Sequence, residues 1–158
     1  PVSRLAYMNP LGPCFLYRRA VYQKLGEYDA EAFLAEDFEY WLRIYREFEI
    51  VHLAKVLYEY RWHGGSLTST APSQALWTSV ERALRRHLPH LRRSSPEERA
   101  RGWMVCAAAA ARRHDSLQAA EAYARAVRTA PGFAVGYVTR KLMDRAGALL
   151  RSSSNGAR

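Results

Sequence analysis

Two adjacent carboxylates, Glu36 and Asp37, open the most strongly patterned stretch of the sequence. Apolar residues then recur at helical spacing, and Asp37 shares their stripe with Trp41 and Tyr45, whereas Glu36 lines up with Tyr40 on the polar side. A carboxylate in such a place can take the proton from an attacking hydroxyl, a step worth about 10²–10⁴-fold in rate. Carboxylates also stabilise a helix start by about 0.3–1 kcal/mol, so a purely structural role for the pair stays open.

Other side chains that could take part in chemistry occur before and after this pair in the sequence. Tyr40 and Trp41 have aromatic faces that suit the C–H face of a pyranose, although the spacing favours packing of Trp41 in the core. Arg18 follows a short apolar run and is either a substrate contact or one of a surface pair. Arg61 and His63 share one face of a later segment. Arg61 suits a phosphate or an ion pair with the two carboxylates, and a lone histidine there is most simply a surface residue.

The composition narrows the class of protein. The chain has 158 residues, of which 49% are hydrophobic, and a formal net charge of +9. No apolar run approaches the roughly 20 residues that span a bilayer, and the start shows no signal peptide. The basic clusters suit a solvated helix face or an anionic membrane, and without any nucleic-acid-binding signature we expect no nucleic acid partner. The two cysteines, Cys14 and Cys106, are far apart and fit no metal-binding or redox spacing, so we predict reduced, half-buried thiols in a cytoplasmic protein.

The elements that must position these side chains divide the chain near residue 69. The first part, 1–69, mixes strand and helix patterns. We predict strands at Cys14–Tyr17, Ile50–Leu53 and Val56–Trp62, and helices at Arg18–Leu25 and Glu36–Phe48. The first of these helices ends at Gly26, a typical C-terminal glycine.

The second part, 70–151, predicts a helical appendage, followed by a flexible tail over 152–158. One helix follows Pro72 and ends at Pro89, and Ser95-Pro96-Glu97-Glu98 is a strong start for the next. Two more helices are expected, from about Ser116 to Ala130 and from about Val135 to Leu150. The stretch 114–137 resembles a single tetratricopeptide-type unit, but no second copy follows, so a generic helical hairpin is the better description.

A family resemblance rests on three stretches that occur in order: Gly12–Asp29, Ala35–Arg43 and Leu57–Ser69. They contain a small-residue strand leading to Arg-Arg, a Gly-x-x-Asp turn, a Glu-Asp helix start and a Tyr-x-Tyr-Arg-Trp-His strand end. Together they resemble the C-terminal, acceptor-side half of a family 2 glycosyltransferase with the GT-A fold. The resemblance implies an α/β fold, here a partial GT-A domain of few strands and helices followed by the helical bundle.

The resemblance also implies roles in an inverting transfer of a sugar from a nucleotide-sugar donor to a hydroxyl acceptor, sugar or lipid-linked. Asp37 matches the catalytic base, and His63 matches a residue near Mg²⁺ or Mn²⁺ and the donor diphosphate. The remaining expected roles are support of the base by Glu36 and Arg61, and acceptor binding by Trp41, Tyr40 and Arg18.

The departures from the family pattern are equally informative. No Asp-x-Asp motif, which in the family grips the metal and diphosphate, occurs in the chain. Tyr58 stands where processive members have the Gln of Gln-x-x-Arg-Trp, which predicts a non-processive enzyme. The start at Pro1 predicts a piece of a longer gene product that is inactive alone. The alternative is a non-catalytic binding or scaffold module whose helical tail and basic charge engage a partner or the inner face of the membrane.

Overall fold

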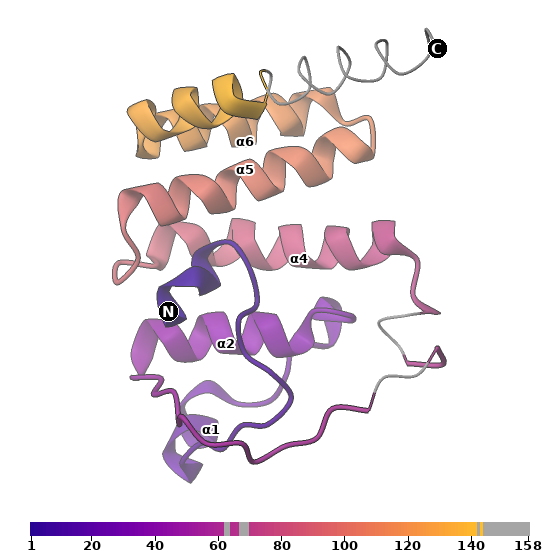
Figure 1. Ribbon diagram of the computed structural model, residues 1–158, viewed down its shortest axis with the longest axis vertical. Helices are drawn as coiled ribbons and strands as arrows, with labels where there is room; N and C mark the ends of the chain where they lie inside the picture. Colours follow the sequence, from indigo (N-terminus) through magenta and orange to yellow (C-terminus); the bar gives the residue numbers. More distant parts are fainter. Residues whose placement is uncertain (62–63, 67–69, 142, 144–158) are drawn as a thin grey trace, which may run out of the picture.

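The computed structural model describes residues 1–61, 64–66, 70–141 and 143, and its regular elements there are all helical (Figure 1). The α-helices are α1 Arg19–Leu25, α2 Glu36–Glu47, α4 Ser73–His87, α5 Pro96–Arg112 and α6 Ser116–Thr129. Residues 131–141 are also helical, and 3₁₀ turns occupy η1 Val2–Ala6, η2 Ala30–Ala32 and η3 Leu88–His90. The prediction of an α/β, GT-A-type domain is therefore wrong, because these residues contain no strand and no sheet.

The segments predicted as strands have extended backbones without a neighbour. Residues 14–17 and 50–61 run as coil outside the helices (Figure 1). Most of their apolar side chains face solvent, with Leu16 98% and Val56 96% exposed, whereas Tyr17 and Ile50 pack partly against the core. Apolar and polar alternation produces a strand only where an adjacent strand accepts and donates the ladder hydrogen bonds. No such ladder joins these segments within the described part of the chain, and Trp62, the last residue of one of them, lies outside it.

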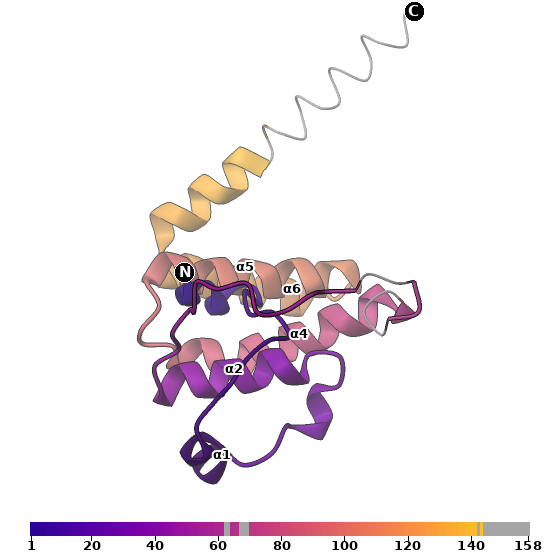
Figure 2. The same cartoon turned by 60° about the horizontal axis from the view of Figure 1, so that its bottom comes forward.

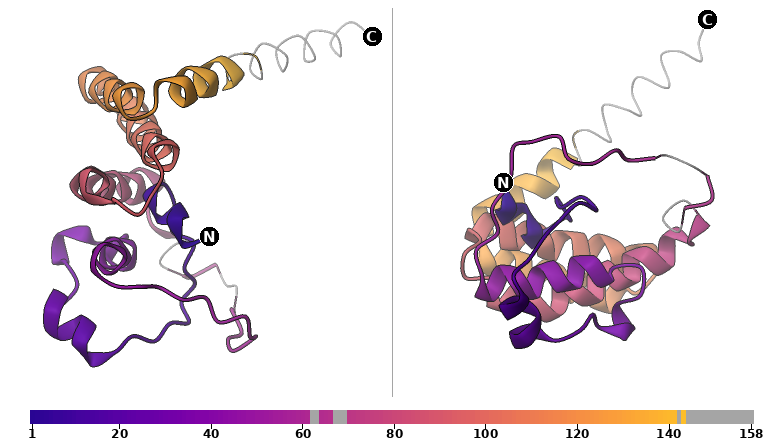
Figure 3. Two further views of the ribbon diagram at one scale, coloured as in Figure 1. Left: turned by 90° about the vertical axis from the view of Figure 1, so that its left-hand side faces the viewer. Right: turned by 90° about the horizontal axis from the view of Figure 1, so that it is seen from below.

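The helices stack in chain order, α2 against α4, α4 against α5 and α5 against α6 (Figures 1 and 3). Short connections at 88–95 and 113–115 make the last three neighbours antiparallel. One continuous core runs through the stack, and its largest fully buried apolar side chains are Tyr40, Leu5, Leu42, Leu84, Leu88 and Leu91. None of the described helices is long and apolar enough to cross a membrane.

Helix starts and ends agree with the sequence signals. Ser95 accepts from the Glu98 backbone at 3.2 Å while the Glu98 carboxylate accepts from the Ser95 backbone at 2.9 Å, which confirms the predicted start of α5. Gly26 ends α1 with φ 73°, a conformation that side-chain-bearing residues rarely adopt. The last predicted helix begins earlier than expected, at residue 131, and its part beyond 143 lies outside the described residues.

The N-terminal turn η1 is pressed into the helical stack against α5 (Figure 3). Leu5 and Ala6 are both 0% exposed. The contact needs a glycine at position 102 of α5, because a Cβ there would lie 2.0 Å from the Ala6 carbonyl oxygen and 2.7 Å from a Leu88 methyl group. A glycine inside a helix costs stability, and here the missing side chain makes room for η1.

Replacement of this glycine tests the packing. We expect Gly102→Ala to lower the free energy of unfolding by about 2–3 kcal/mol, because the new methyl group overlaps backbone that has nowhere to move. Urea unfolding followed by circular dichroism measures it. Gly136→Ala is the matched control: a Cβ there meets nothing within 4 Å, so stability should rise by about 0.5–1 kcal/mol. Equal effects of the two substitutions would contradict the packing of η1.

The two thiols differ more than the sequence suggested, since Cys14 is exposed and Cys106 is fully buried. Burial raises the pKa of Cys106 to about 12, so its reactive thiolate is scarce at any ordinary pH.

We expect a disulfide reagent at mildly alkaline pH to modify Cys14 alone in the folded protein, and Cys106 only after denaturation. Absorbance of the released thiol follows the reaction, and Cys14→Ser should abolish the fast phase. A fast phase that persists in Cys14→Ser would show that Cys106 is accessible.

Candidate functional site

Asp37 and Glu36 form the first turn of α2, where the sequence placed them. Asp37 is exposed, its Oδ2 accepts a hydrogen bond from the Asn9 amide at 3.1 Å, and its Oδ1 accepts from the Phe38 backbone at 2.6 Å. Glu36 is half-buried, and its buried Oε2 has no hydrogen-bond partner among the described residues. The expected orientation is thus reversed, since Asp37 faces solvent and Glu36 turns inward.

The reversal follows from how fully α2 is covered. Its buried side chains are Phe38, Glu39, Tyr40, Trp41, Leu42, Ile44 and Tyr45, which leave no broad polar face. Helix α4, the turns η1 and η2, and helix α1 all pack against it. A helical wheel separates a core face from a solvent face only when a helix is covered on one side. The helical wheel therefore assigns Glu36 and Asp37, in the first turn of α2, to the wrong sides.

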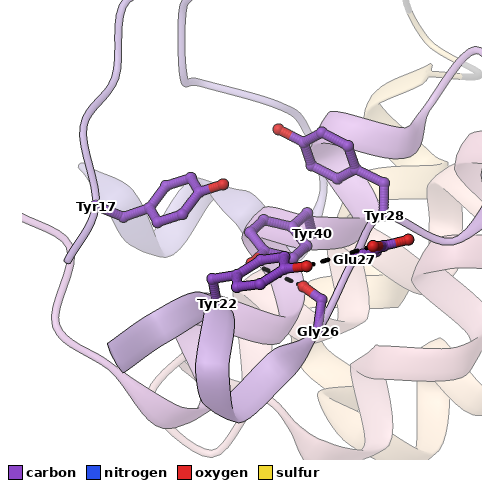
Figure 4. A pocket seen from close by; sticks show the side chains of 6 residues that line it. All are labelled: Tyr17, Tyr22, Gly26, Glu27, Tyr28 and Tyr40. Carbon is purple, nitrogen blue, oxygen red and sulfur yellow. Dashed lines mark hydrogen bonds between the residues drawn. The ribbon is translucent and has the colours of Figure 1, made fainter. Parts of the chain in front are cut away.

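Four tyrosines from α1, the segments on either side of it and α2 form a pocket of about 310 Å³ (Figure 4). Its lining residues are Tyr17, Tyr22, Gly26, Glu27, Tyr28 and Tyr40. Tyr40 is buried and donates its hydroxyl to the Gly26 carbonyl at 3.1 Å, and the exposed Tyr22 donates to the Glu27 carboxylate at 3.3 Å. The Tyr28 and Tyr40 rings meet edge to face with centroids 4.8 Å apart. The pocket thus combines aromatic faces with a carboxylate.

Tyr28 connects the pocket to the carboxylate pair. Partial burial raises the pKa of Tyr28, and the nearby Tyr17 phenol and the Asp37 and Glu36 carboxylates raise that pKa further. Since the ordinary pKa of tyrosine is already about 10, the phenol stays protonated and can donate a hydrogen bond. The two carboxylates therefore act electrostatically on one residue of the pocket, although neither of them lines it.

Of the two aromatic residues proposed for acceptor binding, only Tyr40 lines the pocket. Trp41 is 3% exposed and meets the Phe15 ring edge to face at 4.5 Å, so it belongs to the core. Its indole nitrogen is buried without a hydrogen-bond partner in the described chain. The core-packing alternative weighed for Trp41 is the one observed.

Of the predicted basic residues, the structure describes Arg18 and Arg61. Arg18 is exposed at the N-cap of α1, and Arg61 is exposed at the end of the coil 50–61. No ion pair joins Arg61 to Glu36 or Asp37 in the part of the chain that the structure describes. His63 lies outside the described residues, so its predicted metal contact stays a prediction.

The expected Mg²⁺ or Mn²⁺ needs several oxygen ligands. No group of three or more histidine, cysteine, aspartate or glutamate side chains that could hold an ion occurs among the described residues. The pair of Glu36 and Asp37 does not by itself make such a site, because Mg²⁺ held by one or two carboxylates also needs substrate phosphates. The described residues do not fit the ion, and no step of the chemistry proposed below is assigned to it.

Sequence reasoning missed Tyr17, Tyr22, Tyr28 and Asn9. One signal could have found the first three: they lie within twelve positions of one another, before, within and after α1. The fourth tyrosine of the pocket, Tyr40, belongs to α2, and only tertiary packing brings it close to the other three. Asn9 carries no pattern in the sequence that relates it to Asp37.

Comparison of the chain with protein-family models, with curated proteins and with solved structures finds no match. The resemblance to family 2 glycosyltransferases stays a prediction that rests on the residues quoted for it.

Proposed function

We propose that the chain is the acceptor-side part of an inverting, non-processive glycosyltransferase, with the tyrosine pocket as acceptor site and Asp37 as catalytic base. The observation that carries the proposal is an exposed carboxylate, oriented by Asn9, that acts electrostatically on Tyr28, a lining residue of the tyrosine pocket. The motif resemblance supports the same reaction. Nucleotide-sugar donor and hydroxyl acceptor, sugar or lipid-linked, are the substrates proposed.

The pocket suits a sugar for chemical reasons. Tyrosine rings offer apolar faces to the C–H face of a pyranose, and the Tyr28 hydroxyl and Glu27 carboxylate offer a donor and an acceptor to its hydroxyl groups. Its volume of about 310 Å³ lies at the small end of the range for ligand sites. A single sugar unit at the end of an acceptor is therefore the proposed occupant.

The proposed chemistry is one displacement. An acceptor hydroxyl oxygen forms a bond to the anomeric carbon of the donor while the bond from that carbon to the diphosphate oxygen breaks, and its electron pair leaves with the diphosphate. The hydroxyl proton passes to a carboxylate oxygen of Asp37. The hydrogen bonds from Asn9 and from the Phe38 backbone orient that carboxylate. The diphosphate would be held by residues outside this chain, which has no Asp-x-Asp motif.

Removal of the proposed base tests the reaction. In the full-length gene product, Asp37→Asn should lower the transfer rate by about 10²–10⁴-fold with little change in acceptor affinity, because the amide cannot accept the proton. Incorporation of radiolabelled sugar from a panel of nucleotide sugars measures it. Glu97→Gln is the matched control, since Glu97 is the exposed second residue of α5 just as Asp37 is of α2. Unchanged transfer in Asp37→Asn would remove Asp37 as the base.

Acceptor binding can be tested with the 158-residue chain itself. Tyr28→Leu should weaken binding of a methyl glycoside from a screened panel by about tenfold, because it removes an aromatic face and a donor. Tyr28→Phe should lose less, since the ring remains. Saturation-transfer NMR measures both, and Tyr123→Leu on the remote α6 is the control. Equal binding by all of these variants would show that the sugar does not occupy the tyrosine pocket.

The alternative, a non-catalytic module that binds through its helical part, has one observation in its favour. Arg101, Arg140 and Lys141 form no ion pair with any carboxylate in the described residues. This alternative would be supported if Asp37→Asn left transfer unchanged while the basic helical region still bound a ligand.

A further inference from the structure

A second pocket, of about 270 Å³, lies between α5 and the helix formed by residues 131–141. This helix begins against the N-terminal turns of α5 and then diverges from it (Figure 2). The lining residues are Arg101, Gly132, Phe133, Gly136, Tyr137 and Arg140. The pocket therefore has two cations and two aromatic rings, and no acidic residue lines it.

Arg101 is held in a defined place by aromatic contacts. Its guanidinium carbon lies 4.9 Å from the ring centroid of Tyr7 and 5.3 Å from that of Phe133. A guanidinium that packs its flat face on rings keeps its N–H groups, which lie in its plane, for another partner. No hydrogen bond or ion pair occupies those N–H groups among the described residues. The flat face of the Arg101 guanidinium is thus held by aromatic rings, and its N–H groups are available to a ligand.

Charge at the pocket is not balanced locally. Arg140 also lacks a carboxylate partner in the described part of the chain, and Lys141 lies 5.4 Å from the Tyr137 ring centroid. Arg101 and Arg140 are exposed, whereas the half-buried Arg85 and Arg113 both pair with the carboxylate of Glu81. Two unneutralised guanidiniums at one cavity suit an oxyanion, which each can bind with two parallel hydrogen bonds.

The glycines leave the cavity open. A Cβ added at Gly132 or Gly136 would meet nothing within 4 Å. Alanine would stabilise a helix more than glycine does, so packing within this chain does not require these two glycines. Their absent side chains leave open the pocket that they line together with Arg101 and Arg140.

From this geometry we infer that the pocket binds a phosphate ester, with the phosphate on Arg101 and Arg140 and the esterified group against Phe133 and Tyr137. The ester is either a soluble phosphorylated molecule or the headgroup of an anionic lipid, which share this chemistry. Val135 and Met143, exposed on the same helix, would touch the apolar region of a lipid. The pocket shares no lining residue with the tyrosine pocket, so the two proposals stand or fall separately.

The experiment measures binding of two probes to the 158-residue chain. Phenyl phosphate is titrated by calorimetry as the soluble ester, and sedimentation with phosphatidylcholine vesicles, with and without phosphatidic acid, tests the headgroup. We expect Arg101→Gln and Arg140→Gln each to weaken binding by about tenfold or more, since each loses a charge-assisted contact. Gly136→Leu should abolish binding by filling the pocket while keeping the melting temperature, because leucine favours a helix.

Arg128→Gln is the matched control, because Arg128 is an exposed arginine of α6 outside the pocket and its loss changes the net charge equally. Unchanged binding in this variant, with loss in the three pocket variants, supports the site. Binding of phenyl phosphate identifies a soluble ester, and binding only to vesicles with phosphatidic acid identifies a headgroup. Absence of binding to both probes, or equal weakening by Arg128→Gln and Arg101→Gln, overturns the inference.

Discussion

The buried carboxylate of Glu39 holds the tyrosine pocket and the helical stack together. Glu39 is 2% exposed, and its two oxygens contact His87 Nε2 of α4 and Arg43 Nε of α2, each at 2.9 Å. Arg43 in turn donates to the carbonyl oxygens of Leu25 at 2.7 Å and Glu27 at 2.8 Å. These hydrogen bonds fix the end of α1 and the turn that carries Glu27 and Tyr28. Loss of one partner from such a buried pair typically costs about 3–5 kcal/mol.

The same arrangement recurs at the next layer and explains part of the basic composition. Glu81 of α4 is 2% exposed and binds Arg85 at 2.8 Å and Arg113, which follows α5, at 2.5 Å. Arg85 also reaches Glu121 of α6 at 2.8 Å. Arg85 therefore joins α4 to α6, and Arg86 joins α4 to Asp29, the N-cap of η2. Because each such ion pair is electrically neutral, the net charge of +9 resides on other basic residues.

The helices were predictable because their signals are local. The apolar spacing of α2 and α4, the capping box at Ser95 and the glycine after α1 each depend on neighbours a few residues away. The strands were not, because alternation in residues 50–61 says nothing about whether an adjacent strand exists. At the candidate site the sequence predicts where a residue lies in its helix but not whether its side chain faces solvent. The sequence locates Asp37 at a helix start, but which side of α2 is exposed depends on the four elements that pack against it, α4, η1, η2 and α1.

The tyrosine pocket shows the same limit at longer range. Tyr17, Tyr28 and Tyr40 come from a coil, a turn and a helix, and their rings approach within 4.8–5.8 Å only through tertiary packing. Glu39 was equally hidden, since a single acidic residue in a mostly buried helix gives no periodic signal. Polar groups inside the core, which specify how the helices meet, are the features that pattern analysis finds hardest to detect.

The close fit of η1 against Gly102 also constrains the order in which the molecule can assemble during synthesis. Leu5 and Ala6 leave the ribosome well before the helix that covers them, because α1, α2 and α4 lie between them in the chain. Domains commonly fold as their residues emerge, N-terminal parts first. Here residues 5 and 6 cannot be fully buried so early, because their binding surface is encoded far downstream. The nascent chain therefore exposes the apolar residues of η1 until α5 leaves the exit tunnel.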